Sequence, residues 1–87
     1  MSGAEVELKI GGDEALVLFD LLHRWLDEGH GAPIHGAVAD DAELWALNGL
    51  LAALERTLVE PFRPDYAQSL ANARRIVAER RGGAWPW

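Results

Sequence analysis

The strongest constraint on the fold is a series of leucines at positions 44, 47, 51, 54 and 58, which alternate three- and four-residue spacings. This period places all of them on one side of an α-helix. Asp40 and Glu43 stand at its start with the spacing of a capping box, and we expect the helix to run from there to about Val59. Because such a helix has to bury its apolar side, the leucines are expected to form part of a core.

Two further segments have helical periodicity. Residues 13–28 carry a wide apolar arc opposite charged side chains, with Asp13 as the expected N-cap and with Gly29 and Gly31 after the end. A third helix is expected from Pro64 and Asp65 onwards, after a proline-containing segment at 60–64 in which helix is disfavoured. The sequence therefore predicts a mainly α-helical, three-helix domain.

A short N-terminal β-strand is expected beside these helices. Residues 5–10 alternate polar and apolar side chains, with Val6, Leu8 and Ile10 on one side, as in a half-buried strand. Residues 34–38 are a candidate second strand of a minor two-stranded element. A lone strand leaves its backbone unpaired, so residues 5–10 are expected to pair with 34–38, with the same strand of a second subunit, or with a partner's sheet edge.

Length and composition indicate one folded domain, since the 87 residues are 49% hydrophobic and 25% charged. We place this domain at residues 1–81, followed by a Gly-Gly hinge and a Trp-Pro-Trp tail at 82–87. The absence of cysteine excludes disulfides and Cys-based metal sites. The sequence shows no signal peptide and no long uncharged stretch, so we expect a cytoplasmic protein without a membrane span.

Charge is divided unevenly along the chain, whose net charge is −6. Residues 1–60 carry twelve acidic side chains against three basic ones, and residues 61–87 carry five arginines against two acids. An acidic body repels phosphates, so nucleic acid is not an expected partner. The arginines at 74, 75, 80 and 81 are interpreted as favourable charges late in a helix, with a small basic face as the alternative.

Patterns for catalysis or metal binding are weak. The set His23, Asp27, His30 and His35 could surround a divalent metal, but its spacing matches no compact ligand motif. Exposed or locally hydrogen-bonded histidines are therefore expected. No serine or threonine stands in a nucleophile elbow, and no glycine-rich loop has phosphate-binding spacing. The sequence thus predicts no enzyme and no cofactor.

The candidate protein-contacting residues lie on the central helix and in the tail: Trp45, Gly49, Ala53, Trp85 and Trp87. Small residues at 42, 46, 49 and 53 form a stripe nearly opposite the leucines. Glycine costs about 1 kcal/mol relative to alanine inside a helix, so we interpret Gly49 as room for another backbone or for the Trp45 ring. Solvated alanines with a tolerated glycine are the open alternative. The two tail tryptophans add large apolar surfaces.

Two segments carry a resemblance to a known group of proteins: Glu14-Ala15-Leu16-Val17-Leu18-Phe19 and Leu58-Val59-Glu60-Pro61-Phe62-Arg63-Pro64-Asp65-Tyr66. In these segments the chain resembles a group of small bacterial proteins of unknown function, and the likeness extends over most of residues 5–80. It implies a short strand followed by helices and brings no catalytic residues. Members of the group end soon after the last helix, so the tail at 82–87 departs from their pattern.

Two functions are consistent with these features. The first is a small acidic, non-catalytic protein-interaction module, either a homodimeric accessory protein or an inhibitor of the immunity-protein or antitoxin kind that acidity steers to a basic partner. Alternatively, the negative net charge serves only to keep the protein in solution. The second function is a folded carrier whose C-terminal Ala84-Trp85-Pro86-Trp87 is modified or released. For the tail, a structural role is also open, in which the indoles pack beside the third helix or into a neighbouring subunit.

Overall fold

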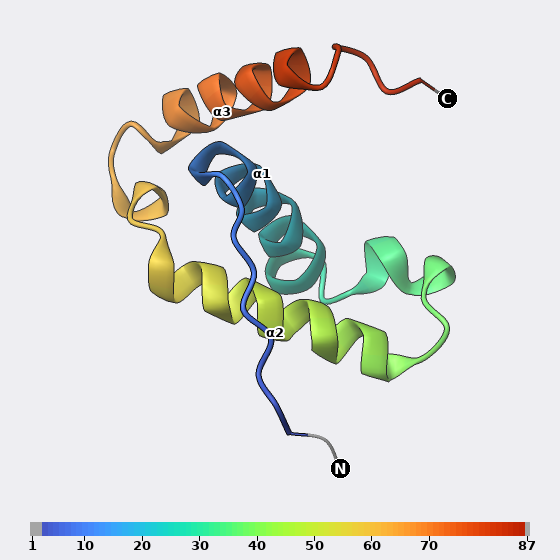
Figure 1. Ribbon diagram of the computed structural model, residues 1–87. Coiled ribbons are helices and arrows are strands. Elements are labelled where there is room, and N and C mark those ends of the chain that lie inside the picture. Colours follow the sequence, from blue (N-terminus) through green and yellow to red (C-terminus); the bar gives the residue numbers. More distant parts are fainter. Residues whose placement is uncertain (1–2, 87) are drawn as a thin grey trace.

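The computed structural model describes residues 3–86, and these fold into three α-helices joined by shorter helical segments (Figure 1). In chain order the elements are α1 (Gly12–Leu22), the π-helical segment η1 (His23–Glu28), the 3₁₀ segment η2 (Ala32–Ala37), α2 (Asp41–Thr57), the 3₁₀ segment η3 (Glu60–Phe62) and α3 (Tyr66–Arg80). The predicted mainly helical fold is confirmed. The three predicted helices correspond to α1 with η1, to α2 and to α3.

α1 begins after Gly11 and not at Asp13. The N–H of Gly11 donates to Oε1 of Glu14 at 3.1 Å, and its carbonyl accepts the N–H of Ala15 at 2.9 Å. Asp13 and Glu14 occupy the first turn, where their negative charge is favourable. The prediction of Asp13 as the N-cap is therefore wrong by two residues, because the Glu14 side chain reaches back to Gly11 from inside the helix.

Two glycines end the first helix as the sequence predicts. A Cβ on Gly29 would lie 2.7 Å from Cδ of Pro33, so only glycine allows the chain to pass this ring. Gly31 has a φ of +81°, in the left-handed region where glycine is favoured. The N–H of Gly29 donates to the carbonyl of Arg24 at 2.9 Å, the wide spacing of a π-turn. The chain turns here towards α2.

α2 starts at the expected cap. Oδ1 of Asp40 accepts the N–H of Ala42 at 2.9 Å, while Oε1 of Glu43 accepts the N–H of Ala39 at 2.8 Å. Two amides at the start of α2 are thereby satisfied by side chains, although Glu43 bonds one residue before the cap itself. The helix ends at Thr57, two residues before the expected end at Val59.

α3 ends in a Schellman motif built on the two glycines. The N–H of Gly83 donates to the carbonyl of Ala78 at 2.7 Å, and the N–H of Gly82 donates to the carbonyl of Glu79 at 3.3 Å. These bonds satisfy carbonyls that the end of the helix would otherwise leave unpaired. Gly82 and Gly83 therefore form the C-terminal cap of α3.

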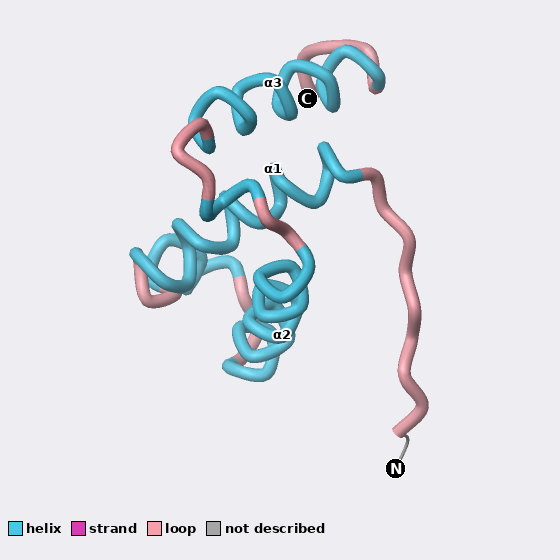
Figure 2. Tube along the Cα trace, turned by 90° about the vertical axis from the view of Figure 1, so that its left-hand side faces the viewer, coloured by secondary structure: helices cyan, strands magenta, loops and turns pink. Residues whose placement is uncertain are grey.

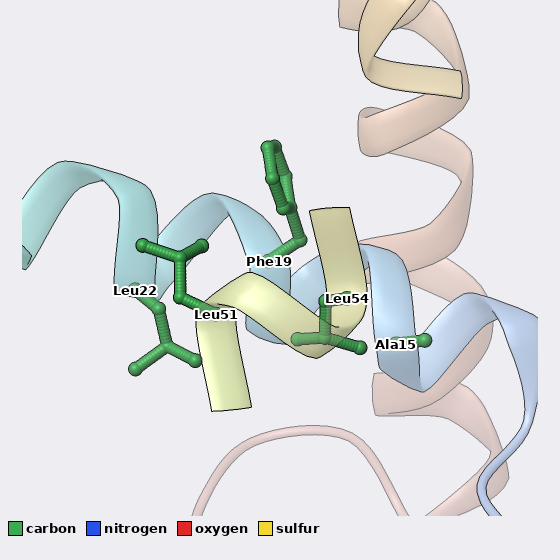
Figure 3. Close-up of a cluster of buried hydrophobic side chains, with 5 residues drawn as sticks. All are labelled: Ala15, Phe19, Leu22, Leu51 and Leu54. Atoms are coloured by element: carbon green, nitrogen blue, oxygen red, sulfur yellow. The ribbon is translucent and has the colours of Figure 1, made fainter. Parts of the chain in front are cut away.

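α1 lies between α2 and α3 and packs against both (Figures 1 and 2). One cluster of buried side chains joins α1 to α2, and Figure 3 shows its members: Ala15, Phe19, Leu22, Leu51 and Leu54. A smaller cluster joins α1 to α3 and consists of Leu16, Leu70 and Ala73. The predicted leucine series is buried at 51 and 54 and half-buried at 44, 47 and 58.

Residues 3–86 contain no β-strand, so the two-stranded element predicted between residues 5–10 and 34–38 is not formed, and pairing of residues 5–10 with another chain stays a prediction. Residues 34–37 belong to the 3₁₀ segment η2, which begins beside Pro33, a residue that lacks an N–H for a sheet and holds φ near the helical value. Residues 5–10 run as an extended segment that leads away from the helices (Figures 1 and 2). We call residues 5–10 the N-terminal arm. Its alternating pattern matches the extended backbone, but no second strand lies beside it within the described chain.

Candidate functional site

The late arginines connect α3 to α1. Nη2 of Arg74 lies 2.8 Å from Oδ2 of Asp20. At the other end of the same interface, Nη2 of Arg81 lies 3.2 Å from Oε2 of Glu14, and Nη2 of Arg80 lies 3.7 Å from an oxygen of Asp13. The fourth arginine, at 75, pairs with the carboxylate at 79 within α3, at 3.2 Å. Their interpretation as helix-end charges is thus incomplete, because three of them neutralise carboxylates of a neighbouring helix.

Asp20 is the most densely bonded carboxylate of this interface, and its side chain is 13% exposed. Oδ2 accepts from Nε of Arg24 and Nη2 of Arg74, each at 2.8 Å, and Oδ1 accepts from the Tyr66 hydroxyl at 3.0 Å. Burial acts to raise the pKa of Asp20, but these bonds and the arginine charges outweigh it and hold the pKa below its ordinary value. Because its two oxygens accept from three donors, two of them on α3, Asp20 is suited to hold α3 against α1.

Tyr66 shares this interface. Burial, with its bond to the Asp20 carboxylate, raises the pKa of Tyr66 to about 12. Its ring meets that of Phe19 edge to face, with 6.4 Å between centroids. Tyr66 therefore contributes one apolar contact and one charge-assisted hydrogen bond to the packing of α3 on α1.

The histidine set is only partly brought together. The His23 ring stacks on Phe19, with 5.7 Å between centroids, and its Nδ1 lies 2.8 Å from Oδ2 of Asp27. His30 lies at the turn before η2 and His35 lies within η2. Within residues 3–86, no three histidine, aspartate or glutamate side chains are grouped so as to hold a metal ion. His23 and Asp27 thus form a local hydrogen-bonded pair at the surface.

Trp45 stands at the edge of an open pocket of about 400 Å³ between the η1–η2 corner and the start of α2. Its indole is 72% exposed. The pocket is lined by three apolar side chains, one glycine and three polar side chains: Leu26, Leu44, Trp45, Gly31, His30, Asp41 and Asn48. Asp41 and Trp45 are one helical turn apart and so occupy the same face of α2. A carboxylate and a large aromatic ring thus share one wall of the pocket.

The sequence indicates Trp45 as a candidate contact residue but does not indicate the rest of this pocket. The spacing of Asp41 and Trp45 is visible in the sequence, and it alone could have indicated a shared surface. His30 and Gly31 reach the pocket through the turn that follows η1, and Leu26 reaches it from η1 itself. Their approach to α2 is a tertiary contact, which the helical period of a single segment does not reveal.

The small-residue stripe of α2 faces outwards over most of its length. A Cβ on Gly49 would meet nothing within 4 Å, so the Trp45 ring does not lie on Gly49. Ala42 and Ala46 are exposed, and Ala53 is half-buried. The described chain therefore leaves room on this side of α2, and contact with another backbone stays a prediction.

The tail is described as far as Pro86. Trp85 is 76% exposed, which does not fit burial of its ring in a groove beside α3. Trp87 lies outside the described residues. The two candidate surfaces therefore belong to different elements, since Trp45 is on α2 and Trp85 follows the cap of α3.

Comparison with known proteins gave no match: the chain matched no protein family, no curated protein and no solved structure. The resemblance to small bacterial proteins accordingly stays a prediction. Among residues 3–86, no helix has both the length and the apolar character needed to cross a membrane.

Proposed function

We propose that the chain is a non-catalytic protein-interaction module that binds a basic partner through the surface around Trp45. The observation that carries this proposal is the 72% exposed indole at the edge of the pocket. Tryptophan is among the residues that contribute most to protein–protein affinity, especially where it borders a pocket that the partner fills. An exposed indole beside a pocket therefore fits a surface that becomes buried on association.

The chemistry of the pocket favours a cationic side chain of the partner. Asp41 offers a carboxylate and Trp45 offers the aromatic face that cations prefer. Arginine can satisfy both, because its planar guanidinium stacks on a ring while donating to a carboxylate. We infer that an arginine of the partner enters this pocket.

The charge of the whole chain supports the same type of partner. The net charge is −6, and most acidic side chains precede residue 61. The arginines of α3 that reach α1 are already paired with carboxylates and so do not form an opposing basic surface. Long-range attraction would therefore accelerate encounters with a basic protein. If the basic partner is a toxin, the chain would act as an immunity protein or antitoxin in a bacterial cytoplasm.

The small residues of α2 would allow close approach next to the pocket. Ala42, Ala46 and Gly49 are exposed and short, so a helix or loop of the partner can lie near the backbone of α2. Ala53 lies further along the same stripe and is half-buried. The stripe supports the proposal only together with Trp45, which supplies the apolar anchor.

The test starts with capture of partners from the native host and continues with the purified partner. Trp45→Ala is expected to raise the Kd about thirtyfold, which corresponds to about 2 kcal/mol, and Asp41→Asn is expected to weaken binding most at low salt. Glu55→Gln is the control for Asp41→Asn, because it removes an exposed charge from the same helix away from the pocket. Unchanged binding by Trp45→Ala, or a partner without basic residues at the contact, would contradict the proposal.

The carrier function is retained as a second candidate because the tail is accessible. Residues 81–86 are all exposed, and Trp85 is 76% exposed. A processing enzyme could therefore reach the segment after the cap of α3. Intact-mass measurement of the protein from its native host decides this point: a mass change at Ala84-Trp85-Pro86-Trp87 supports the carrier, and an unmodified full-length chain excludes it.

A further inference from the structure

The N-terminal arm combines an exposed apolar side with an unpaired backbone. Val6 is 81% exposed, Leu8 is 79% exposed and Ile10 is 47% exposed. In an extended segment these three side chains point to one side, with Glu5, Glu7 and Lys9 on the other. Within residues 3–86, the backbone of residues 5–10 makes no hydrogen bond. A segment of this kind is suited to pair with another strand.

We propose that the arm pairs in antiparallel fashion with the arm of a second copy of this chain, with the two Leu8 residues opposite each other. In this register Glu7 of each arm stands opposite Lys9 of the other, and Val6 stands opposite Ile10. Both opposite-charge pairs lie on one face, and six apolar side chains lie on the other. Cross-strand pairs of both kinds stabilise antiparallel strands.

Charge selects this register over its neighbours. A shift in one direction that keeps the apolar sides together places Glu5 opposite Lys9 but also Glu7 opposite Glu7. The corresponding shift in the other direction places Lys9 opposite Lys9. Parallel, in-register pairing places Glu5, Glu7 and Lys9 each opposite its own copy, which gives three like-charge pairs. A shift by one residue places the apolar side chains of one arm on the face that carries the charged side chains of the other. The register with Leu8 opposite Leu8 therefore combines two opposite-charge pairs with no like-charge pair, and this self-complementarity favours a second copy over an unrelated strand.

This inference rests on the proposed function in taking protein contact as the role of the chain, but it concerns a different surface and names the partner. The arm leads away from the helices and does not lie along α2, which carries Trp45 (Figure 2). A ribbon of two strands is only marginally stable by itself. The pairing is therefore expected to be weak and concentration-dependent, and its test needs a trapping step.

The first test uses the absence of cysteine from the chain. Leu8→Cys introduces a single thiol, and directly opposite residues in antiparallel strands are close enough for a disulfide. Mild oxidation is expected to trap a covalent dimer. Val6→Cys is the matched control: Val6 is as exposed as Leu8, but the two copies of residue 6 lie about 13 Å apart along the strands, so trapping should be at least tenfold slower. Equal trapping rates for the two variants would overturn the proposal.

The second test exchanges charges. Glu7→Lys and Lys9→Glu each create like-charge pairs in the dimer, so each variant alone should dimerise at least tenfold more weakly in sedimentation equilibrium. An equimolar mixture of the two restores both opposite-charge pairs and should form a heterodimer. Glu5→Lys is the control, because residue 5 stands opposite Gly11 and faces no charge. Failure of the mixture to restore dimerisation would overturn the register and with it the proposal.

These outcomes are separable from the test of the Trp45 surface. All arm variants replace exposed side chains, and far-ultraviolet circular dichroism checks that the helices are intact. Loss of arm pairing with retained, Trp45-dependent binding of a basic partner overturns only the arm inference. Arm pairing without any effect of Trp45→Ala on a partner overturns only the proposed function.

Discussion

Asp20 accepts hydrogen bonds from three side chains on two helices, and its replacement therefore affects more than one contact. Asp20→Ala leaves the Tyr66 hydroxyl without its acceptor and Arg74 without its interhelical carboxylate. We expect a loss of about 2 kcal/mol in the free energy of unfolding, the typical range for hydrogen bonds to charged groups. Urea denaturation followed by circular dichroism measures it.

Asp27→Ala is the matched control for Asp20→Ala. Asp27 also pairs with a neighbour one helical turn away, but its side chain is 43% exposed and its partner is His23. Exposed ion pairs contribute roughly 0.5 kcal/mol or less. Equal losses for the two variants would show that the position of Asp20 between α1 and α3 has no special importance.

Tyr66 is the only tyrosine of the chain, so tyrosinate absorbance reports on this residue alone. In the folded chain Tyr66 is expected to titrate with a pKa of about 12, compared with about 10 for an ordinary tyrosine. Because the folded pKa is raised, the associated stability is present below the unfolded pKa and is lost as pH rises towards the folded one. Asp20→Asn should lower the pKa of Tyr66 only partly, since burial is the largest cause. A midpoint in the folded protein equal to that in urea would contradict this prediction.

At the scale of elements, the adjacent residues Leu50 and Leu51 of α2 are expected to contribute differently to the stability of the fold. Leu51 is 1% exposed in the α1–α2 cluster, whereas Leu50 is 37% exposed. Leu51→Ala should cost about 3 kcal/mol, the usual range for a buried leucine, and lower the melting temperature by on the order of 15 °C. Leu50→Ala should cost roughly 1 kcal/mol or less. Thermal unfolding of both variants checks this difference, and similar costs would mean that the helix buries a different side.

The elements that sequence predicts best are those whose signals are local. The leucine period and the cap at Asp40 lie within α2, and its observed start agrees with them. The Gly-Gly stop after α3 is likewise local, because each glycine bonds to a carbonyl of the preceding turn. Helix existence and approximate length could therefore be predicted from these residues.

The elements that sequence predicts poorly depend on partners elsewhere. The arm has the alternation of a strand, but pairing requires a second strand. In the candidate at residues 34–38, residues 34–37 lie in the 3₁₀ segment that contains Pro33. Arg74 and Arg81 look like helix-end charges until α1 is known to lie beside them. The same holds for the pocket, because the helical period places Trp45 on the surface of α2 but does not reveal that His30 lies beside it. Long-range packing decides each of these cases.

At the scale of the whole molecule, stability should decline at acid pH because carboxylates connect α1 with α3. A hydrogen bond from the Gly11 backbone, together with Arg81, lowers the pKa of Glu14, and the bonds around Asp20 lower its pKa as well. A carboxylate whose pKa is lowered in the folded chain stabilises the fold at pH values above its ordinary pKa, about 4. This stabilisation is lost as the pH falls through the pKa of the folded state. The urea concentration at the midpoint of unfolding should therefore decrease once the pH is below about 4. Asp20→Asn should flatten this dependence, and an equally steep decline in that variant would exclude Asp20 as a source.

The central position of α1 has a consequence for how the molecule opens. The buried cluster between α1 and α2 has five members, and the one between α1 and α3 has three. Leu58 and Tyr66, which contact both clusters, stand at either end of the connection from α2 to α3. Separation of α3 from α1 disrupts the smaller cluster and the ion pairs between these two helices, and it leaves the larger cluster in place. Amide protons of α3 are expected to exchange with solvent through this partial unfolding, at a lower free energy than those of α1 and α2.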